Sequence, residues 1–228
     1  MRLRHAANVM YQQLANHPDM VAVVDVLLWG GDVLAPVGAF IRGHFDLNVP
    51  EFAESLEALT LRLSGTCSDD EVQKIVAVLK GFYKHTSSSE SAKQWRGCVV
   101  ETLTYTLIKE FYADNDCLLG CLVYARNNSA VKVTLKEVDI CAWDNNKRIG
   151  EAYECKMSPA AIENADCYNL VNIAEECKSY QKALRIGIVS FEPHNQIVKR
   201  LLQKKADQRI EAFGLDDLYK LQDEFGMI

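Results

Sequence analysis

Three strand-like segments between residues 117 and 156 constrain the fold of this chain more than any other feature. The apolar run CLLGCLVY at 117–124 has the composition of a buried strand. Apolar residues alternate with others over 138–142, as in a strand with one buried face. The polar DNNK at 144–147 is typical of a hairpin turn, and 149–156 follows as the returning strand. Three neighbouring strands are therefore expected, the last two forming a hairpin.

Helical patterns surround these strands. A helix is expected over 92–112, where apolar residues recur at near-helical spacing, and a longer helix from about 159 to 183. Beyond it the patterns predict a strand at 184–191, a helix at 194–205, a short strand at 209–213 and a helix at 215–224. This order predicts an α/β fold with a mixed sheet flanked by helices.

The first part of the chain has a different character. Residues 1–84 contain no convincing alternating strand, but Pro50 opens a helical segment, and Ser68 with Glu71 forms a capping-box pattern. The apolar run near the N-terminus, Met20 to Trp29, is too short to span a bilayer and is expected to be a buried helix.

The serine-rich stretch HTSSSES at 85–91 is the best candidate for a boundary in the chain. We expect residues 1–88 to form a helical region that serves docking or dimerisation. Residues 89–228 are expected to form the α/β domain.

Composition sets broad limits on function. A chain of 228 residues with net charge −6 does not cling indiscriminately to nucleic acid, although a local basic surface remains compatible with that charge. No secretory signal pattern is present, so a cytoplasmic protein with reduced cysteines is expected. The eight cysteines and five histidines show no zinc-type spacing, and the histidines are expected to have no chemical role.

The predicted hairpin brings charged residues together. Glu154 and Lys156 point to one face of their strand because side chains alternate, and Asp139 on the preceding strand can reach the same face. Two carboxylates about 4 Å apart repel by roughly 4 kcal/mol at an effective dielectric near 20, so the pair needs compensation. Mg²⁺ (or Mn²⁺) prefers such oxygen ligands, and the backbone carbonyl of Cys155 is a further candidate ligand. The pattern therefore favours metal-dependent hydrolysis.

The residues ValAsp at 138–139 and GluCysLys at 154–156 resemble the PD-(D/E)xK nuclease superfamily, over about residues 92–213. Val138 stands where the motif name has proline. The resemblance implies a restriction-endonuclease-like α-β-β-β-α-β core, with the helical region before it.

The resemblance also implies roles for single residues. Asp139 and Glu154 would ligate the metal ion, Lys156 would assist the attacking water, and Glu101 on the preceding helix would hold a second metal ion or its water. Tyr180 and Gln181 would approach the substrate. These two residues do not keep the glutamine-to-tyrosine spacing of exonuclease-like members, so an endonuclease is expected.

Basic residues gather near the end of the chain, at Lys199, Arg200, Lys204, Lys205 and Arg209. On a helix, Arg200 and Lys204 are one turn apart and face the same way. The cluster is expected to follow a phosphate backbone, or else to be a solvated helix face.

These patterns predict a Mg²⁺-dependent endodeoxyribonuclease, of the kind found in restriction, repair or anti-phage defence systems. The alternatives are a ribonuclease with the same site, a catalytically inactive nucleic-acid-binding or scaffold domain of the same fold, and a solvated strand face without chemistry. No GxxxxGK[ST] loop is present, so any translocation requires a partner ATPase or helicase chain. A homodimer is expected if both DNA strands are cut, and no membrane partner is expected.

Overall fold

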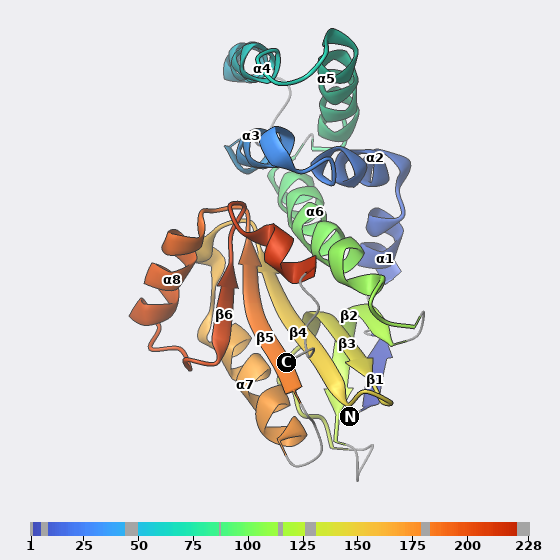
Figure 1. Ribbon diagram of the computed structural model, residues 1–228, viewed down its shortest axis with the longest axis vertical. Helices are drawn as coiled ribbons and strands as arrows, with labels where there is room; N and C mark the ends of the chain where they lie inside the picture. Colours follow the sequence, from blue (N-terminus) through green and yellow to red (C-terminus); the bar gives the residue numbers. More distant parts are fainter. Residues whose placement is uncertain are drawn as a thin grey trace. The chain divides into compact units, whose positions relative to one another are not determined.

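A mixed sheet organises this computed structural model (Figure 1). The structure describes residues 2–5, 9–43, 50–86, 88–113, 116–125, 131–178 and 183–222. The six strands among them are β1 (Arg2–His5), β2 (Cys117–Tyr124), β3 (Val138–Asp144), β4 (Ile149–Lys156), β5 (Ala183–Ser190) and β6 (Ile210–Phe213), and they lie side by side in chain order. Pairs from β1 to β4 are antiparallel, whereas β4–β5 and β5–β6 are parallel.

The helices precede and follow the central hairpin. The described α-helices are α1 (Val9–Ala15), α2 (Pro18–Leu27), α3 (Gly31–Gly43), α4 (Pro50–Leu63), α5 (Asp69–Tyr83), α6 (Ser89–Lys109), α7 (Asn164–Cys177) and α8 (His194–Gln203). Two short 3-10 helices, η1 (Pro159–Ala161) and η2 (Leu218–Gln222), complete the described elements. The segment from α6 to β5 has the order α-β-β-β-α-β, so the predicted fold class is confirmed.

Several expected elements differ from those observed. The N-terminal strand β1 was not expected, because a four-residue strand has little pattern of its own and depends on pairing with β2. The expected helix at 159–183 is wrong at both ends, because α7 covers only Asn164–Cys177 and Ala183 already belongs to β5. Ser158 caps the short η1, Ile162 is extended, and Glu163 and Asp166 then form the capping box of α7. The expected terminal helix at 215–224 is only the 3-10 helix η2.

The chain divides into two compact units, residues 13–99 and residues 1–12 together with 100–228. The domain division expected at residue 88 stays a prediction. In the helical unit, Phe40, Phe52 and Tyr83 meet edge to face, and the predicted capping box at Ser68 and Glu71 is confirmed. None of the described helices has the length and apolarity that crossing a membrane requires.

Helices α7 and α8 pack on one face of the sheet (Figure 1). The shared core includes Cys141, Ala152 and Ile186 from the strands, with Leu170 of α7 and Ile197 of α8. Because Ala152 and Glu154 have the same parity on β4, the Glu154 side chain belongs to this face. The packing therefore places a buried carboxylate at the end of an apolar core.

Gly187, on the central strand β5, leads to a stability prediction. A Cβ there would lie 2.7 Å from Cε2 of Phe213 and 3.2 Å from Cδ1 of Tyr153, both of which are buried. Gly187→Ala should therefore lower the free energy of unfolding by about 1–3 kcal/mol. Gly97→Ala on α6 is the control, because no atom lies within 4 Å of a Cβ at that position and Ala favours a helix. Equal urea midpoints for the two variants would contradict the observed packing.

Candidate active site at the ends of β3 and β4

The candidate site begins where the ladder between β3 and β4 ends. The last paired residues are Ile140 and Tyr153. Asp139 directly precedes Ile140 on β3, and its Oδ2 accepts the backbone N–H of Cys155 at 2.6 Å. A side-chain carboxylate thus takes the place of a ladder carbonyl, and it fixes Asp139 against the end of β4.

The ammonium of Lys156 lies among three carboxylates. Its Nζ is 3.0 Å from Oε2 of Glu154 and 3.3 Å from Oδ2 of Asp139. It is also 3.3 Å from Oδ1 of Asp166 on α7. The structure thus brings Asp139, Glu154 and Lys156 together on adjacent strands, and it adds an acidic residue that the sequence reading missed.

Two further residues of the site were also missed. Lys136 forms an ion pair with Asp166 and lies 3.9 Å from Oε2 of Glu154. Asn169, fully buried on α7, donates to Oε1 of Glu154 at 3.4 Å and accepts the backbone N–H of Leu135 at 2.8 Å. The available signal was the spacing of Asp166 and Asn169, three residues apart and hence on one helix face.

Glu101 of α6 belongs to the same group of charges. Its side chain is partly buried. Burial raises its pKa well above the ordinary value, and the nearby Asp139, Glu137 and Glu154 carboxylates raise it further, while Lys156 opposes them. The structure therefore places this predicted residue beside the hairpin carboxylates.

The balance of charge in the cluster is negative. Burial, reinforced by Asp139, raises the pKa of Glu154 to about 9, although Lys156 and Lys136 oppose the shift. Burial alone would lower the pKa of Lys156, but Asp139, Glu154 and Asp166 outweigh it and raise that pKa. Lys156 thus stays an ammonium, while Glu154 holds a proton unless more positive charge is nearby.

The donor set suits a hard divalent cation. Asp139, Glu154 and Glu101 offer carboxylate oxygens, which Mg²⁺ and Mn²⁺ prefer. Burial raises the pKa of the Cys155 thiol, which contacts Thr104 of α6, so this residue has only its main chain to offer. A divalent cation would favour the charged forms of Glu154 and Glu101, whose pKa values are raised by burial first and by neighbouring carboxylates second.

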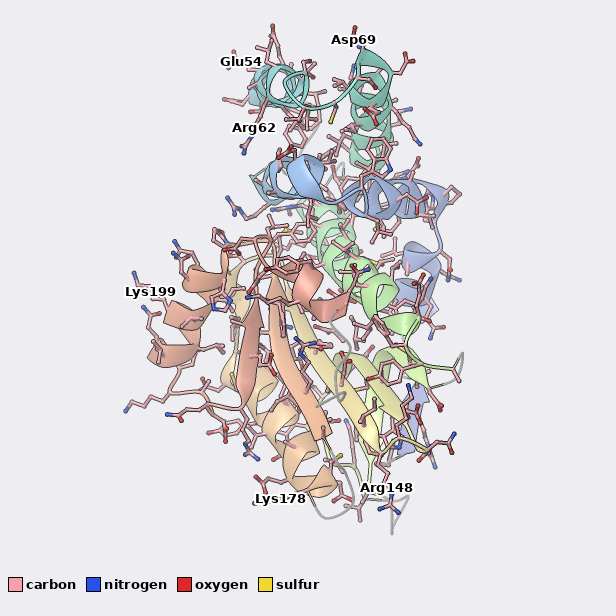
Figure 2. All side chains as sticks on the ribbon, in the orientation of Figure 1. Glu54, Arg62, Asp69, Arg148, Lys178 and Lys199 are labelled. Atoms are coloured by element: carbon pink, nitrogen blue, oxygen red, sulfur yellow. The ribbon has the colours of Figure 1, made fainter. Side chains whose placement is uncertain are left out.

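The other predicted residues lie elsewhere. Lys199 is exposed and projects outward from α8 (Figure 2). Nη2 of Arg200 donates to the carbonyl of Ala160 at 3.4 Å, and Arg209 pairs with Asp207 and Glu175. Part of the basic cluster is therefore already engaged within the protein. Tyr180 and Gln181 lie outside the described residues.

Lys204 and Lys205 line a cavity of about 280 Å³ beside α7. The other lining residues are Asn164, Cys167, Tyr168, Val171, Ala206 and Asp207. Tyr168 is exposed, so an aromatic ring and two ammonium groups face solvent together. Aromatic rings and cations in combination are a common means of holding a single nucleic-acid strand.

Comparisons with known proteins find a likeness in structure but none in sequence. No family model matches this chain, and no curated protein matches its sequence. Among solved structures, the chain is similar to Can2 from Sulfobacillus thermosulfidooxidans in complex with cyclic tetra-adenylate, with a TM-score of 0.39 and 15% sequence identity. The match covers 97% of this chain and 54% of that chain, so this chain spans about half the length of its neighbour.

The raised pKa of Glu154 predicts how stability depends on pH. In the unfolded chain this carboxyl titrates near its ordinary value of 4.5, but in the folded protein near 9. Between these values the folded state holds a proton that the unfolded state has released, so stability falls as pH rises. Glu154→Gln removes this loss. At pH 8 its free energy of unfolding should exceed that of the wild type by more than about 1.4 kcal/mol, which is the free energy of one pKa unit.

Urea unfolding of both proteins from pH 5 to pH 9 measures this difference. Glu57→Gln, at an exposed position of α4, is the control and should follow the wild type at every pH. A constant difference between Glu154→Gln and the wild type across this range would contradict the raised pKa.

Proposed function

We propose that this chain is a metal-dependent nuclease that hydrolyses phosphodiester bonds, with DNA rather than RNA as its substrate. The observation that carries the proposal is the position of Lys156, whose Nζ lies within 3.3 Å of Asp139 and Glu154 at the end of the hairpin. Nothing in the folding of a strand requires an ammonium to lie between the buried carboxylate of Glu154 and the partly buried one of Asp139. In a hydrolytic site such a group stabilises the negative charge that develops in the transition state.

Asp139, Glu154 and Glu101 are the proposed ligands of Mg²⁺ or Mn²⁺, with the carbonyl of Cys155 as a further one. When bound, the cation supplies a Lewis acid that polarises a phosphoryl oxygen and makes water more acidic. Asn169 and the Cys155 N–H hold the carboxylates of Glu154 and Asp139 in place. Residues that fix ligand orientation in this way support both metal affinity and activity.

Lys156 is proposed to act as a hydrogen-bond donor that stabilises negative charge, and not as a general base. Its raised pKa keeps it protonated at neutral pH, so it has no lone pair with which to accept a proton. The ammonium stabilises the charge that develops on the phosphoryl oxygens as the water oxygen bonds to phosphorus and the phosphorus–oxygen ester bond breaks. The proton released by the water ends on the leaving oxygen.

The substrate is proposed to be nucleic acid, with DNA placed first because the sequence motif resembles DNA-cleaving enzymes. Lys199, Lys204 and Lys205 offer exposed or partly exposed positive charge near α8 for phosphate contacts. A ribonuclease with the same site, and a binding domain without turnover, are the alternatives that the cleavage assay separates. A homodimer is proposed for cleavage of both DNA strands, and a partner ATPase or helicase chain for any unwinding or translocation.

Lys156→Ala should lower the rate of cleavage by at least about 100-fold, because the ammonium acts on transition-state charge more than on ground-state binding. The measurement is cleavage of single- and double-stranded DNA and RNA with Mg²⁺ or Mn²⁺, beside DNA binding by the same variant. Lys178→Ala removes a highly exposed lysine after α7 and should leave the rate unchanged. Wild-type cleavage by Lys156→Ala would remove the lysine from the mechanism.

Glu101→Gln tests whether the site extends to α6. The substitution keeps the size of the side chain but removes a carboxylate that interacts with Asp139 and Glu154. It should raise the Mg²⁺ concentration needed for half-maximal cleavage and lower the maximal rate, by about 10-fold or more. Superimposable curves of rate against Mg²⁺ for variant and wild type would confine the site to the hairpin.

A further inference from the structure

Three side chains of the helical unit, His17, Asp19 and His85, meet although they come from two separate segments. Nε2 of His85 lies 2.7 Å from Oδ2 of Asp19, and Nδ1 of His17 lies 3.8 Å from the same oxygen. All three ligand atoms fall within 4.8 Å of one another. No short spacing joins the histidines in the sequence, so no chemical role was expected for them, but the structure brings two of them together.

The distances suit a tetrahedral ion. Zinc bonds of about 2.0–2.1 Å in a tetrahedron place neighbouring ligand atoms roughly 3.3 Å apart. The observed separations from Oδ2 of Asp19, 2.7 Å to His85 and 3.8 Å to His17, lie on either side of this value. Small movements of the side chains are therefore enough to enclose an ion.

The neighbouring residues hold the three side chains in place. The ring of His85 stacks on Trp95 with centroids 4.3 Å apart and an interplanar angle of 6°. The ring of His17 meets the same indole edge to face at 5.0 Å. One tryptophan of α6 thus orients both imidazoles, a fixed arrangement that lowers the entropy lost on binding.

A glycine makes room for the carboxylate. Gly81 lies within α5, where glycine costs about 1 kcal/mol relative to alanine. A Cβ at this position would lie 3.0 Å from Oδ1 of Asp19. The carboxylate of Asp19 therefore lies close to where a side chain at position 81 of α5 would begin.

Nδ1 of His17 accepts the backbone N–H of Asp19 at 3.2 Å, so this nitrogen carries a lone pair. A bound ion would take this lone pair in place of the N–H. The side chains of His17, Asp19 and His85 are 36%, 39% and 33% exposed, which leaves solvent access for a fourth ligand. Two imidazoles, one carboxylate and an open position are a donor set that zinc accepts.

We propose that His17, Asp19 and His85 form a binding site for one borderline divalent cation, with Zn²⁺ as the first candidate. Imidazole nitrogen selects Zn²⁺, Co²⁺ or Ni²⁺ over Mg²⁺, so this site differs in class from the all-oxygen centre at Asp139 and Glu154. The ion joins the start of α2 to the residues that follow α5. Bound metal stabilises the folded helical unit, because the unfolded chain does not hold these ligands together.

The experiment is a Zn²⁺ titration of the full chain by calorimetry, with Mg²⁺ in excess and in a Cys67→Ser background. That substitution removes a partly exposed thiol. One equivalent should bind, and the thermal midpoint should rise with Zn²⁺. Co²⁺ in place of Zn²⁺ should give the visible absorption of a tetrahedral site.

His85→Gln and His17→Asn should each weaken binding more than about 10-fold. The asparagine keeps a side-chain oxygen at the N-cap of α2, so the helix is retained. Two controls should bind as the wild type does: His194→Gln, whose ring contacts Asp217, and Asp139→Asn, in the other centre.

Absence of saturable binding to the wild type overturns the proposal, as does wild-type affinity in both ligand variants. Loss of Zn²⁺ binding in Asp139→Asn would instead show that the ion binds at the hairpin. Far-UV circular dichroism identifies any variant that fails to fold, and Asp19→Asn, which keeps the size of the side chain, then serves in its place. The outcome is independent of the nuclease assay, because neither the ion nor the residues are shared.

Discussion

The sharing of one ammonium among three carboxylates is the interaction on which the rest of the site depends. Lys156 contacts Glu154, Asp139 and Asp166, and these residues come from two strands and a helix. Without this positive charge, the buried carboxyl of Glu154 would lose the nearest cation and keep only Asn169 and the more distant Lys136. Carboxylates in excess over lysines keep the cluster short of positive charge. That shortage is what makes the end of the hairpin suited to a divalent cation.

The central position of β4 explains how the site is assembled. This strand pairs antiparallel with β3 and parallel with β5, so its end lies between two neighbours. The register places Ile140 opposite Tyr153, and continued by one residue it places Asp139 opposite Glu154. A slip of one residue would place Asp139 opposite Cys155 and turn the two carboxylates to opposite faces. The buried faces of β3 and β4 prevent such a slip, so packing and site geometry depend on the same pairing.

The two cation sites that we propose differ in chemistry and in how they are held. The hairpin site has oxygen donors with two lysines beside them, which suits an ion that binds phosphate and water as well. The site at His17, Asp19 and His85 has nitrogen donors ordered by Trp95, which suits an ion that ties segments of chain together. Each site lies within one compact unit.

The sequence by itself determined the central strands, the hairpin turn and the common face of Glu154 and Lys156, because these follow from local periodicity and turn chemistry. It also indicated the capping box at Ser68, which depends on residues three positions apart, whereas Glu101 was suggested by the resemblance of its motif alone. Only the tertiary structure decided the pairing of β1, the contribution of Lys136 and Asp166, and the meeting of His17 with His85. These contacts join residues far apart in the chain, and their free energy comes from packing that no local pattern encodes.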